Sequence, residues 1–297
     1  MTFTRLLSVE ARRYRARRLV RFFVLLALVG IAVAGLVVFV RSHRTVDLSG
    51  PAVSYQRQAF DQCLSGDFGV PPTDPNIRAE CQMIIFGDPR FHLTMLNDVF
   101  QGVTVPLALL AWLLAASFAG AEWHAGTVGT LLTWEPRRIR VLAAKAVACL
   151  VLTFAASIAL LAILGLALAP AAALRGTTAG ANAAWVRGLA GVALRSALLA
   201  SLFAAFGMAI ASVARNTAAA LGVGFAYLLI LENLLGVLRP AWRAWMLGAN
   251  SIVLVSGHPV PDLAPGRSVF EAGVLLAAYA LGALGLAALD FRRRDVL

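Results

Sequence analysis

Apolar residues in this chain are gathered into long blocks separated by polar stretches, and they do not alternate along the chain. Six blocks are long enough to cross a bilayer. A helix rises ~1.5 Å per residue and the hydrocarbon core is ~30 Å thick, so roughly 20 residues suffice. The blocks cover residues 22–40, 99–121, 146–169, 188–214, 217–238 and 269–289. The pattern predicts six transmembrane helices.

The fold class predicted from these blocks is all-α, that of a polytopic membrane protein. Ala, Leu and Gly dominate the blocks, and the period of two that marks a transmembrane β-barrel is absent from the sequence. The first block follows a basic segment, as a signal core would, but it is longer than usual. Residues 41–44 follow it in place of a small-residue cleavage site. We expect this block to be retained as a helix.

Basic residues indicate the orientation, because Arg and Lys stay preferentially on the cytoplasmic side. They are concentrated before the first block, between the second and third blocks, and after the sixth. Both termini are therefore predicted to be cytoplasmic. The formal net charge of +11 then faces an anionic lipid leaflet, and nucleic-acid binding is not needed to explain it. Abundant Ala, and Arg in place of Lys, are typical of high-GC bacteria, so we expect a bacterial cytoplasmic membrane.

The N-terminal segment, residues 1–21, has the pattern of an interfacial helix. Its apolar residues share one helical face, and most of its arginines lie elsewhere. Such a helix lies in the membrane interface, among lipid headgroups, before the chain enters the first span. A solvated basic tail is the alternative. The apolar face comprises Phe3, Leu6, Leu7, Ala11 and Tyr14.

The outer segment between the first two spans, residues 41–98, is long and turn-rich, and we interpret it as a small external subdomain. It contains Cys63 and Cys81, whereas Cys149 lies within the third block. Two neighbouring thiols outside the cytoplasm usually oxidise. The sequence therefore predicts a disulfide between Cys63 and Cys81, with free or separately paired thiols as the alternative.

Motifs for catalysis are absent from the sequence. It has no G-x-x-x-x-G-K-[ST] phosphate-binding loop, no H-E-x-x-H, no G-x-S-x-G and no C-x-x-C. Glu122 and His124 are two residues apart, so they do not share a helical face as an acid–base pair. The histidines lie in separate segments, which disfavours a metal site. We expect no enzyme activity, metal or cofactor in this chain.

Two charged residues, Arg195 and Glu232, fall inside predicted spans at matching depth on consecutive helices. Only Arg215 and Asn216 separate these helices, and Asn216 is suited to cap the second one. Because an unpaired ion in hydrocarbon is costly, we predict an ion pair between Arg195 and Glu232 that fastens the hairpin. Contact of Arg195 with an anionic substrate is the alternative.

The inner loop, residues 120–145, resembles the loop between the second and third helices of ABC-2 type transporter permeases. In that family Glu, Gly-Thr, a Leu-Leu-Thr step, Pro, Arg and a closing Lys recur in this order. The six spans, the basic interfacial start and the size of the fifth loop also agree. The matching residues are Glu122, Gly126, Thr127, Leu131, Leu132, Thr133, Pro136, Arg137, Arg138 and Lys145.

The resemblance implies the permease subunit of an ATP-driven ABC transporter, exporting a substrate that the sequence does not identify. ATP and Mg²⁺ would bind to a separate ATP-binding subunit, on which the inner loop would dock for ATPase coupling. A second permease, identical or related, would complete the channel within the membrane lipids. Residues 239–268 would form a re-entrant or interfacial segment. An integral-membrane enzyme or a non-transporting sensor is the alternative function, and an ordinary solvated turn is the alternative for the loop.

Overall fold

The structure is a computed structural model that describes residues 2–43, 54–66, 71, 77–88, 90–127, 129, 133 and 135–293. Apart from one isolated bridge, the regular elements within these residues are all helices. The six that are long and apolar enough to span a membrane are Arg18–Arg41, Leu93–Trp123, Arg138–Arg175, Ala183–Ala214, Thr217–Leu238 and Val269–Arg293. The predicted all-α fold is confirmed, and each predicted block lies inside one of these helices.

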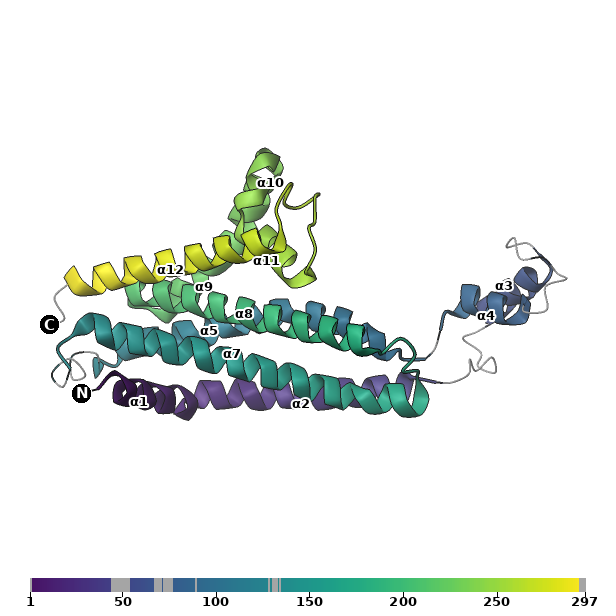
Figure 1. The fold of residues 1–297 in the computed structure, drawn as a ribbon, viewed down its shortest axis with the longest axis horizontal. Helices are drawn as coiled ribbons and strands as arrows, with labels where there is room; N and C mark the ends of the chain where they lie inside the picture. The colour runs from purple at the N-terminus through teal and green to yellow at the C-terminus, as the bar shows by residue number, and fades with distance from the viewer. Residues whose placement is uncertain are drawn as a thin grey trace. The chain divides into compact units, whose positions relative to one another are not determined.

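Figure 1 labels most of the elements in chain order. The first are α1 (Phe3–Ala16), α2 (Arg18–Arg41), α3 (Ser54–Leu64), α4 (Ile77–Phe86), the 3₁₀ turn η2 (Leu93–Met95) and α5 (Leu96–His124). Next come α7 (Arg138–Pro170), the π turn η3 (Ala171–Arg175), α8 (Ala183–Ala214), α9 (Thr217–Phe225) and the π turn η4 (Ala226–Leu231). The last are α10 (Glu232–Leu238), the 3₁₀ helix η5 (Pro240–Trp245), α11 (Leu247–Ser256) and α12 (Val269–Arg293).

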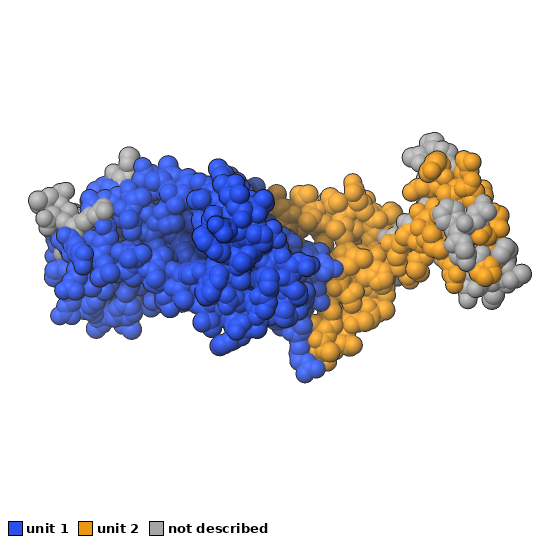
Figure 2. Space-filling view, turned by 90° about the horizontal axis from the view of Figure 1, so that it is seen from above, with its two compact units in different colours: residues 1–28, 97–162, 186–297 blue, residues 29–96, 163–185 orange. Residues whose placement is uncertain are grey.

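The chain divides into two compact units, which Figure 2 colours separately. Unit 1 comprises Met1–Leu28, Asn97–Ala162 and Val186–Leu297, and unit 2 comprises Val29–Leu96 and Ile163–Trp185. Helices α2 and α7 therefore contribute residues to both units. The inner loop lies in unit 1, and the cysteine pair of the outer segment lies in unit 2.

Helix α8 is the most buried of the six spans. In its most apolar stretch 72% is buried, against 6% for Arg18–Arg41 and 11% for Thr217–Leu238. Small residues allow this, because Ala and Gly let neighbouring helix backbones approach closely. In unit 1, α8 runs beside α5, α7 and α12, and these helices share one apolar core (Figure 1). The exposed apolar faces of the other spans are suited to contact lipid.

Trp112 of α5 lies between α8 and α9. A Cβ atom added to Gly207 of α8 would lie 3.0 Å from Trp112 Cδ1, and one added to Gly224 of α9 would lie 2.7 Å from Trp112 Cε2. The indole Nε1 donates to the Ala220 carbonyl of α9 at 3.3 Å. The indole thus contacts both helices of the predicted hairpin, and two glycines make the space for it.

The turn between α8 and α9 has the predicted cap. Asn216 Oδ1 accepts a hydrogen bond from the Ala218 amide at 2.8 Å, and Arg215 takes a left-handed conformation with φ 53°. Nine residues later the span passes into the π turn η4. Figure 1 shows α10 turning away from the direction of α9. A π turn is a recognised cause of such a bend.

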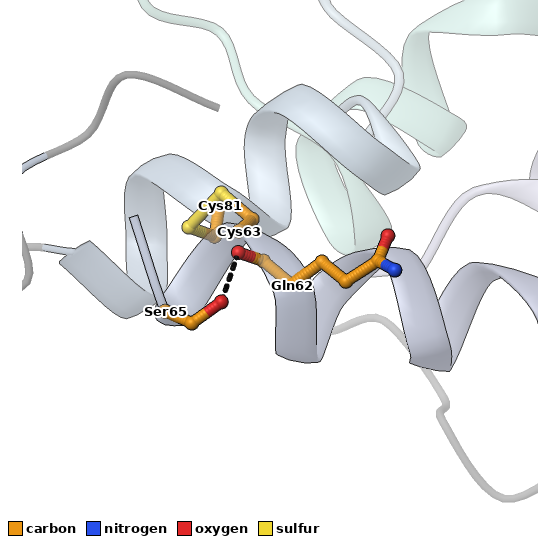
Figure 3. Close-up of a disulfide and its surroundings, with 4 residues drawn as sticks. All are labelled: Gln62, Cys63, Ser65 and Cys81. Carbon is orange, nitrogen blue, oxygen red and sulfur yellow. Dashed lines mark hydrogen bonds between the residues drawn. A yellow bond between two sulfur atoms is a disulfide. The ribbon is translucent and has the colours of Figure 1, made fainter. Parts of the chain in front are cut away.

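In unit 2, α3 and α4 pack together around the disulfide that joins Cys63 to Cys81 (Figure 3). Both cysteines are fully buried and pack against Phe60, and their Cα atoms are 5.6 Å apart. The pairing is the one predicted from the sequence. The remaining cysteine, Cys149, is a buried free thiol in α7.

In unit 2, a network of hydrogen bonds joins the end of α2 to residues 91–93 and to the segment after α7. The Phe91 amide donates to Ser42 Oγ at 3.0 Å, and Ser42 Oγ donates to the Arg175 carbonyl at 3.2 Å. Thr177 exchanges two backbone hydrogen bonds with this strand-like segment, one with Phe91 and one with Leu93. A Cβ at Gly176 would lie 2.9 Å from the Phe91 carbonyl carbon, so a larger side chain does not fit there.

Candidate functional site

The N-terminal helix α1 buries an acidic residue against the bundle. Leu6, Glu10 and Tyr14 are its buried residues, and their spacing of four places them on one face. Glu10 is fully inaccessible, although its side chain is acidic. The sequence predicted an apolar face for lipid, but in the structure much of that face packs on protein. A buried carboxylate requires a partner.

Lys145 of α7 lies between two carboxylates. Its ammonium forms a salt bridge with Glu122 Oε2 of α5 and lies 3.3 Å from Glu10 Oε2 of α1. The three side chains expose 12% or less of their surface. Glu122 and Lys145 are the first and last residues of the inner-loop motif, so the ion pair joins the helices on either side of the loop.

Arg17 completes this charge cluster at the junction of α1 and α2. Its guanidinium donates to the carbonyls of Ser117 and Phe118 at 2.7 and 3.1 Å, and it lies 3.9 Å from Glu122 Oε1. Burial lowers the pKa of Arg17, and the neighbouring Glu122 carboxylate acts in the opposite direction. We call Glu10, Arg17, Glu122 and Lys145 the inner charge cluster. Arg13, at a half-exposed position of α1, also donates to Glu10 Oε1 at 3.0 Å.

Aromatic contacts pack α1 against the same cluster. The Tyr14 ring meets the Phe118 ring edge-on at 5.1 Å, and the Lys145 ammonium lies 4.5 Å from the Phe118 centroid. The Tyr14 hydroxyl shares a hydrogen bond of 3.3 Å with Thr153 Oγ1 of α7. Burial and the adjacent Cys149 raise the pKa of Tyr14, so its hydroxyl stays protonated. Helix α1 is therefore fixed to both α5 and α7.

The loop between α5 and α7 is shorter than the predicted 120–145, because α5 continues to His124 and α7 begins at Arg138. Leu131 and Leu132 lie outside the described residues. Glu122 is part of the inner charge cluster, and Arg138 of α7 donates to the Phe291 carbonyl of α12 at 3.5 Å. The other predicted loop residues are all exposed: Gly126, Thr127, Thr133, Pro136 and Arg137.

Three other elements reach the same end of unit 1 as this loop. Trp123 of α5 meets Phe291 near the end of α12, with ring centroids 5.7 Å apart. The Arg215 guanidinium, in the turn before α9, lies 4.6 Å from the Trp123 ring centroid. Helix α1 reaches this end through the inner charge cluster. The first and last helices thus reach the same end of unit 1 (Figure 1), as expected if both termini face the same side.

The predicted ion pair between Arg195 and Glu232 is wrong. Glu232 instead binds the first turn of α11: its Oε1 accepts from the amides of Gly248 and Ala249 at 2.6 and 3.2 Å. These amides have no partner within the helix, and the helix dipole favours an anion at this position. A Cβ on Gly248 would lie 2.6 Å from that oxygen, so glycine permits the approach.

Arg195 lies at the other end of α11. A Cβ on Gly257, the residue that ends α11 in a left-handed conformation with φ 75°, would lie 2.7 Å from Arg195 Cζ. A cation at a helix C-terminus is favoured by the dipole. The two ions therefore lie at opposite ends of one short helix. The sequence argument failed because it assumed straight neighbouring helices, whereas the span bends at η4 before it reaches Glu232 (Figure 1). Matching depth therefore does not bring Arg195 and Glu232 together.

The sequence did not predict the burial of Glu10, the short helix α11, or the positions of Glu232 and Arg195 at the ends of that helix. Glu10 repeats the spacing of Leu6 and Tyr14, and a charge on an apolar face could have indicated a buried partner. Gly248 and Gly257 lie close to the two ends of an apolar stretch of ten residues, Leu247–Ser256, and such glycines are a signal of a short helix. No sequence signal assigns these ends to Glu232 and Arg195, because that depends on the packing of distant helices.

The described residues contain no group of three or more His, Cys, Asp or Glu side chains that could hold a metal ion. The chain matches no protein-family model, and no curated protein matches its sequence. The resemblance of the inner loop to ABC-2 permeases therefore depends on the loop residues, and the structure adds the contacts that these residues make.

Proposed function

We propose that this chain is the permease subunit of an ATP-driven ABC transporter, and that its inner loop docks on a separate ATP-binding subunit. The observation that carries the proposal is the salt bridge between Glu122 and Lys145. It joins the first and last residues of the motif that resembles the family's coupling loop. If a partner pushes on the loop, the helices that flank it must move together for the motion to reach the membrane-spanning part.

The inner charge cluster supplies such a base. Glu122 belongs to α5, Lys145 to α7 and Glu10 to α1, so three helices are bound together beneath the loop. Buried ion pairs are screened little by solvent, which keeps this connection stiff. A displacement of the loop is therefore passed to α5 and α7 together, and α1 moves with them.

The loop itself offers an exposed, basic surface. Thr127, Thr133, Pro136 and Arg137 are exposed, whereas the residues of the cluster below are buried. Arg137 and Arg138 give the surface a positive charge that suits an acidic partner surface. In the proposed assembly, ATP and Mg²⁺ bind to the ATP-binding subunit, and a second permease subunit completes an export pathway.

The test is co-purification of the chain with an ATP-binding subunit encoded beside it, followed by measurement of its ATPase rate in lipid nanodiscs. Replacing Arg137 and Arg138 with Ala should weaken the complex and lower the ATPase rate, because two cations, of which Arg137 is exposed and Arg138 half-buried, are lost from the docking surface. The matched control replaces Arg292 and Arg293, two exposed cations of α12, with Ala.

The proposal fails if no ATP-binding subunit co-purifies with the wild-type chain, or if the two double variants weaken the complex equally. In either case an integral-membrane enzyme or a sensor becomes the better description. Membrane insertion of each variant is checked by size-exclusion chromatography in detergent, so that misfolding is not mistaken for lost docking.

A further inference from the structure

Unit 1 contains a cavity of about 330 Å³ that no step of the proposed coupling uses. Helices α5, α8 and α11 and the region where α9 meets η4 contribute its walls. Its volume falls at the small end of the range for sites that bind small molecules, roughly 300–1,000 Å³. The residues that shape it include Val105, Leu109, Phe203, Leu228, Ile252 and Val255.

The hydroxyl groups that line this cavity are already engaged within the protein. Thr104 Oγ1 is 2.6 Å from Ser196 Oγ and donates to the Phe100 carbonyl. Ser251 Oγ donates to the Leu247 carbonyl at 2.6 Å, and Ser256 Oγ donates within its own turn. These hydroxyls are directed to their own helices or to α8. The surface that remains for a ligand is mainly hydrocarbon.

No charged side chain lines the cavity. Arg195 and Glu232 are nearby in the fold, but they lie at the two ends of α11, which forms one wall. An ion or a sugar would lose its hydration here without gaining partners, and that loss is costly. Even water avoids apolar cavities that offer no hydrogen-bond partners. The lining therefore favours a hydrocarbon ligand over a charged or strongly hydrated one.

Gln101 is the exception among the lining residues. It makes no side-chain hydrogen bond with the residues that the structure describes, so its amide is available to a ligand. An amide can donate to a neutral oxygen such as that of an ester or a hydroxyl. The site therefore combines an apolar volume with one uncharged polar group.

We infer that this cavity binds a hydrocarbon chain carrying an uncharged oxygen next to it, and that Gln101 hydrogen-bonds to that oxygen. The chain has two possible sources with the same chemistry: an acyl chain of a bilayer lipid, or a free apolar molecule dissolved in the membrane. Binding takes place within one copy of this chain. It needs no ATP-binding partner, so it can be tested even if the proposed transport function is wrong.

The experiment is photo-labelling of the purified chain in nanodiscs with two probes. One is a phosphatidylcholine with a diazirine in its acyl chain, and the other is a free fatty alcohol with the same diazirine. Cross-linked peptides are identified by mass spectrometry. Val105→Trp should lower labelling of the cavity peptides by roughly tenfold, because the indole fills the space that the chain needs.

The matched control is Val151→Trp. Val105 and Val151 expose 60% and 59% of their surface, but Val151 of α7 is not among the residues that line the cavity. Gln101→Leu should lower labelling by the probe that occupies the site, through loss of one hydrogen bond. Labelling by the phosphatidylcholine identifies a lipid chain, and labelling by the alcohol alone identifies a free molecule.

Two outcomes would overturn the inference: cavity peptides that neither probe labels, or labelling that Val105→Trp and Val151→Trp reduce to the same extent. Unchanged labelling in Gln101→Leu would remove the assigned role of that amide. Because the measurement uses the chain alone, failure to find an ATP-binding subunit leaves its result unaffected.

Discussion

Two regions of unit 1 place ions inside an apolar bundle, and they stabilise them differently. In the inner charge cluster, Glu10, Glu122 and Lys145 lie beside one another and compensate directly. Around α11, Glu232 and Arg195 do not meet, and each lies at one end of the helix. The first arrangement joins three long helices. The second fixes a single helix of ten residues.

The difference shows what each region can tolerate. An ion in the cluster depends on the side chains of its neighbours, so loss of one member leaves another charge buried without compensation. An ion at a helix end depends on backbone groups, which substitution cannot remove. We therefore expect the cluster to be sensitive to side-chain changes and the α11 region to be sensitive to changes at its glycines.

The largest effect is expected for Lys145→Met. It removes the buried ammonium that lies between Glu10 and Glu122 and leaves Arg13 and Arg17 beside these carboxylates. Removing one partner of a buried ion pair costs about 3–5 kcal/mol. The measurement is thermal unfolding of the purified chain, followed by size-exclusion chromatography. Arg292→Met, at an exposed position of α12, is the control and should change little.

Rescue makes this prediction specific. Adding Glu10→Gln and Glu122→Gln to Lys145→Met should recover much of the lost stability, because the two buried carboxylates that Lys145 compensated are then neutral. If the triple variant is less stable than Lys145→Met alone, the carboxylates do not oppose each other as described.

The second prediction concerns the end of α11. Gly257→Ala should destabilise the chain by about 2 kcal/mol, because the residue has φ 75° and a Cβ would strike the Arg195 guanidinium. Gly282→Ala is the control, since a Cβ there meets nothing within 4 Å and Ala favours the helix. Thermal unfolding of both variants decides the matter. Equal stability of the two would contradict the placement of Arg195.

Double-mutant cycles compare the two regions directly. Glu10 and Lys145 should show a coupling of about 1 kcal/mol, because they are in contact within one network. Arg195 and Glu232 should be additive within about 0.5 kcal/mol, since each interacts with a different end of α11. Unfolding of the single and double neutral variants gives both values. Strong coupling between Arg195 and Glu232 would contradict the structure and support the ion pair predicted from the sequence.

An ion pair near the surface of unit 2 should contribute less to stability than either buried arrangement. The Arg90 guanidinium, hydrogen-bonded to Asp88 at 2.7 and 2.8 Å, holds the pKa of that carboxyl well below its usual range. A lowered pKa gives stability that is present above the unfolded value of about 3.9 and is lost as the pH falls towards the folded value. The pair should thus contribute evenly from pH 8 to about pH 5, and less below about pH 4.

This contribution should be small, because solvent screens surface ion pairs and they add little to stability. Hydrogen exchange of peptides covering residues 77–95 measures it locally. Asp88→Asn should remove the acid-dependent part, and a profile that is identical in the variant would show that the pair contributes nothing.

Much of the fold follows from local pattern, and the sequence predicted it. The length of an apolar block decides whether it can span a bilayer, so all six spans were found, together with the Asn216 cap and the all-α class. The Cys63–Cys81 bond was also predictable, because it joins residues close in sequence within one segment. Such features need no knowledge of helix packing.

Contacts between distant helices were predicted poorly. The pairing of Arg195 with Glu232 assumed that the two spans run side by side along their length, but the second span bends at η4 before Glu232 (Figure 1). The burial of Glu10 depends on where α1 docks, which periodicity does not specify. Which charges meet is decided by how neighbouring helices fill space, and a single sequence contains that information only indirectly.

The disulfide of unit 2 has a consequence for biosynthesis. A bond between Cys63 and Cys81 forms where oxidants have access, so finding it oxidised in cells would place the segment between the first two spans outside the reducing cytosol. Cys149, the third cysteine of the chain, is a buried free thiol in α7, so it should not interfere with this measurement. The oxidised fraction of newly made chains, read on a non-reducing gel, therefore times the crossing of this segment during synthesis.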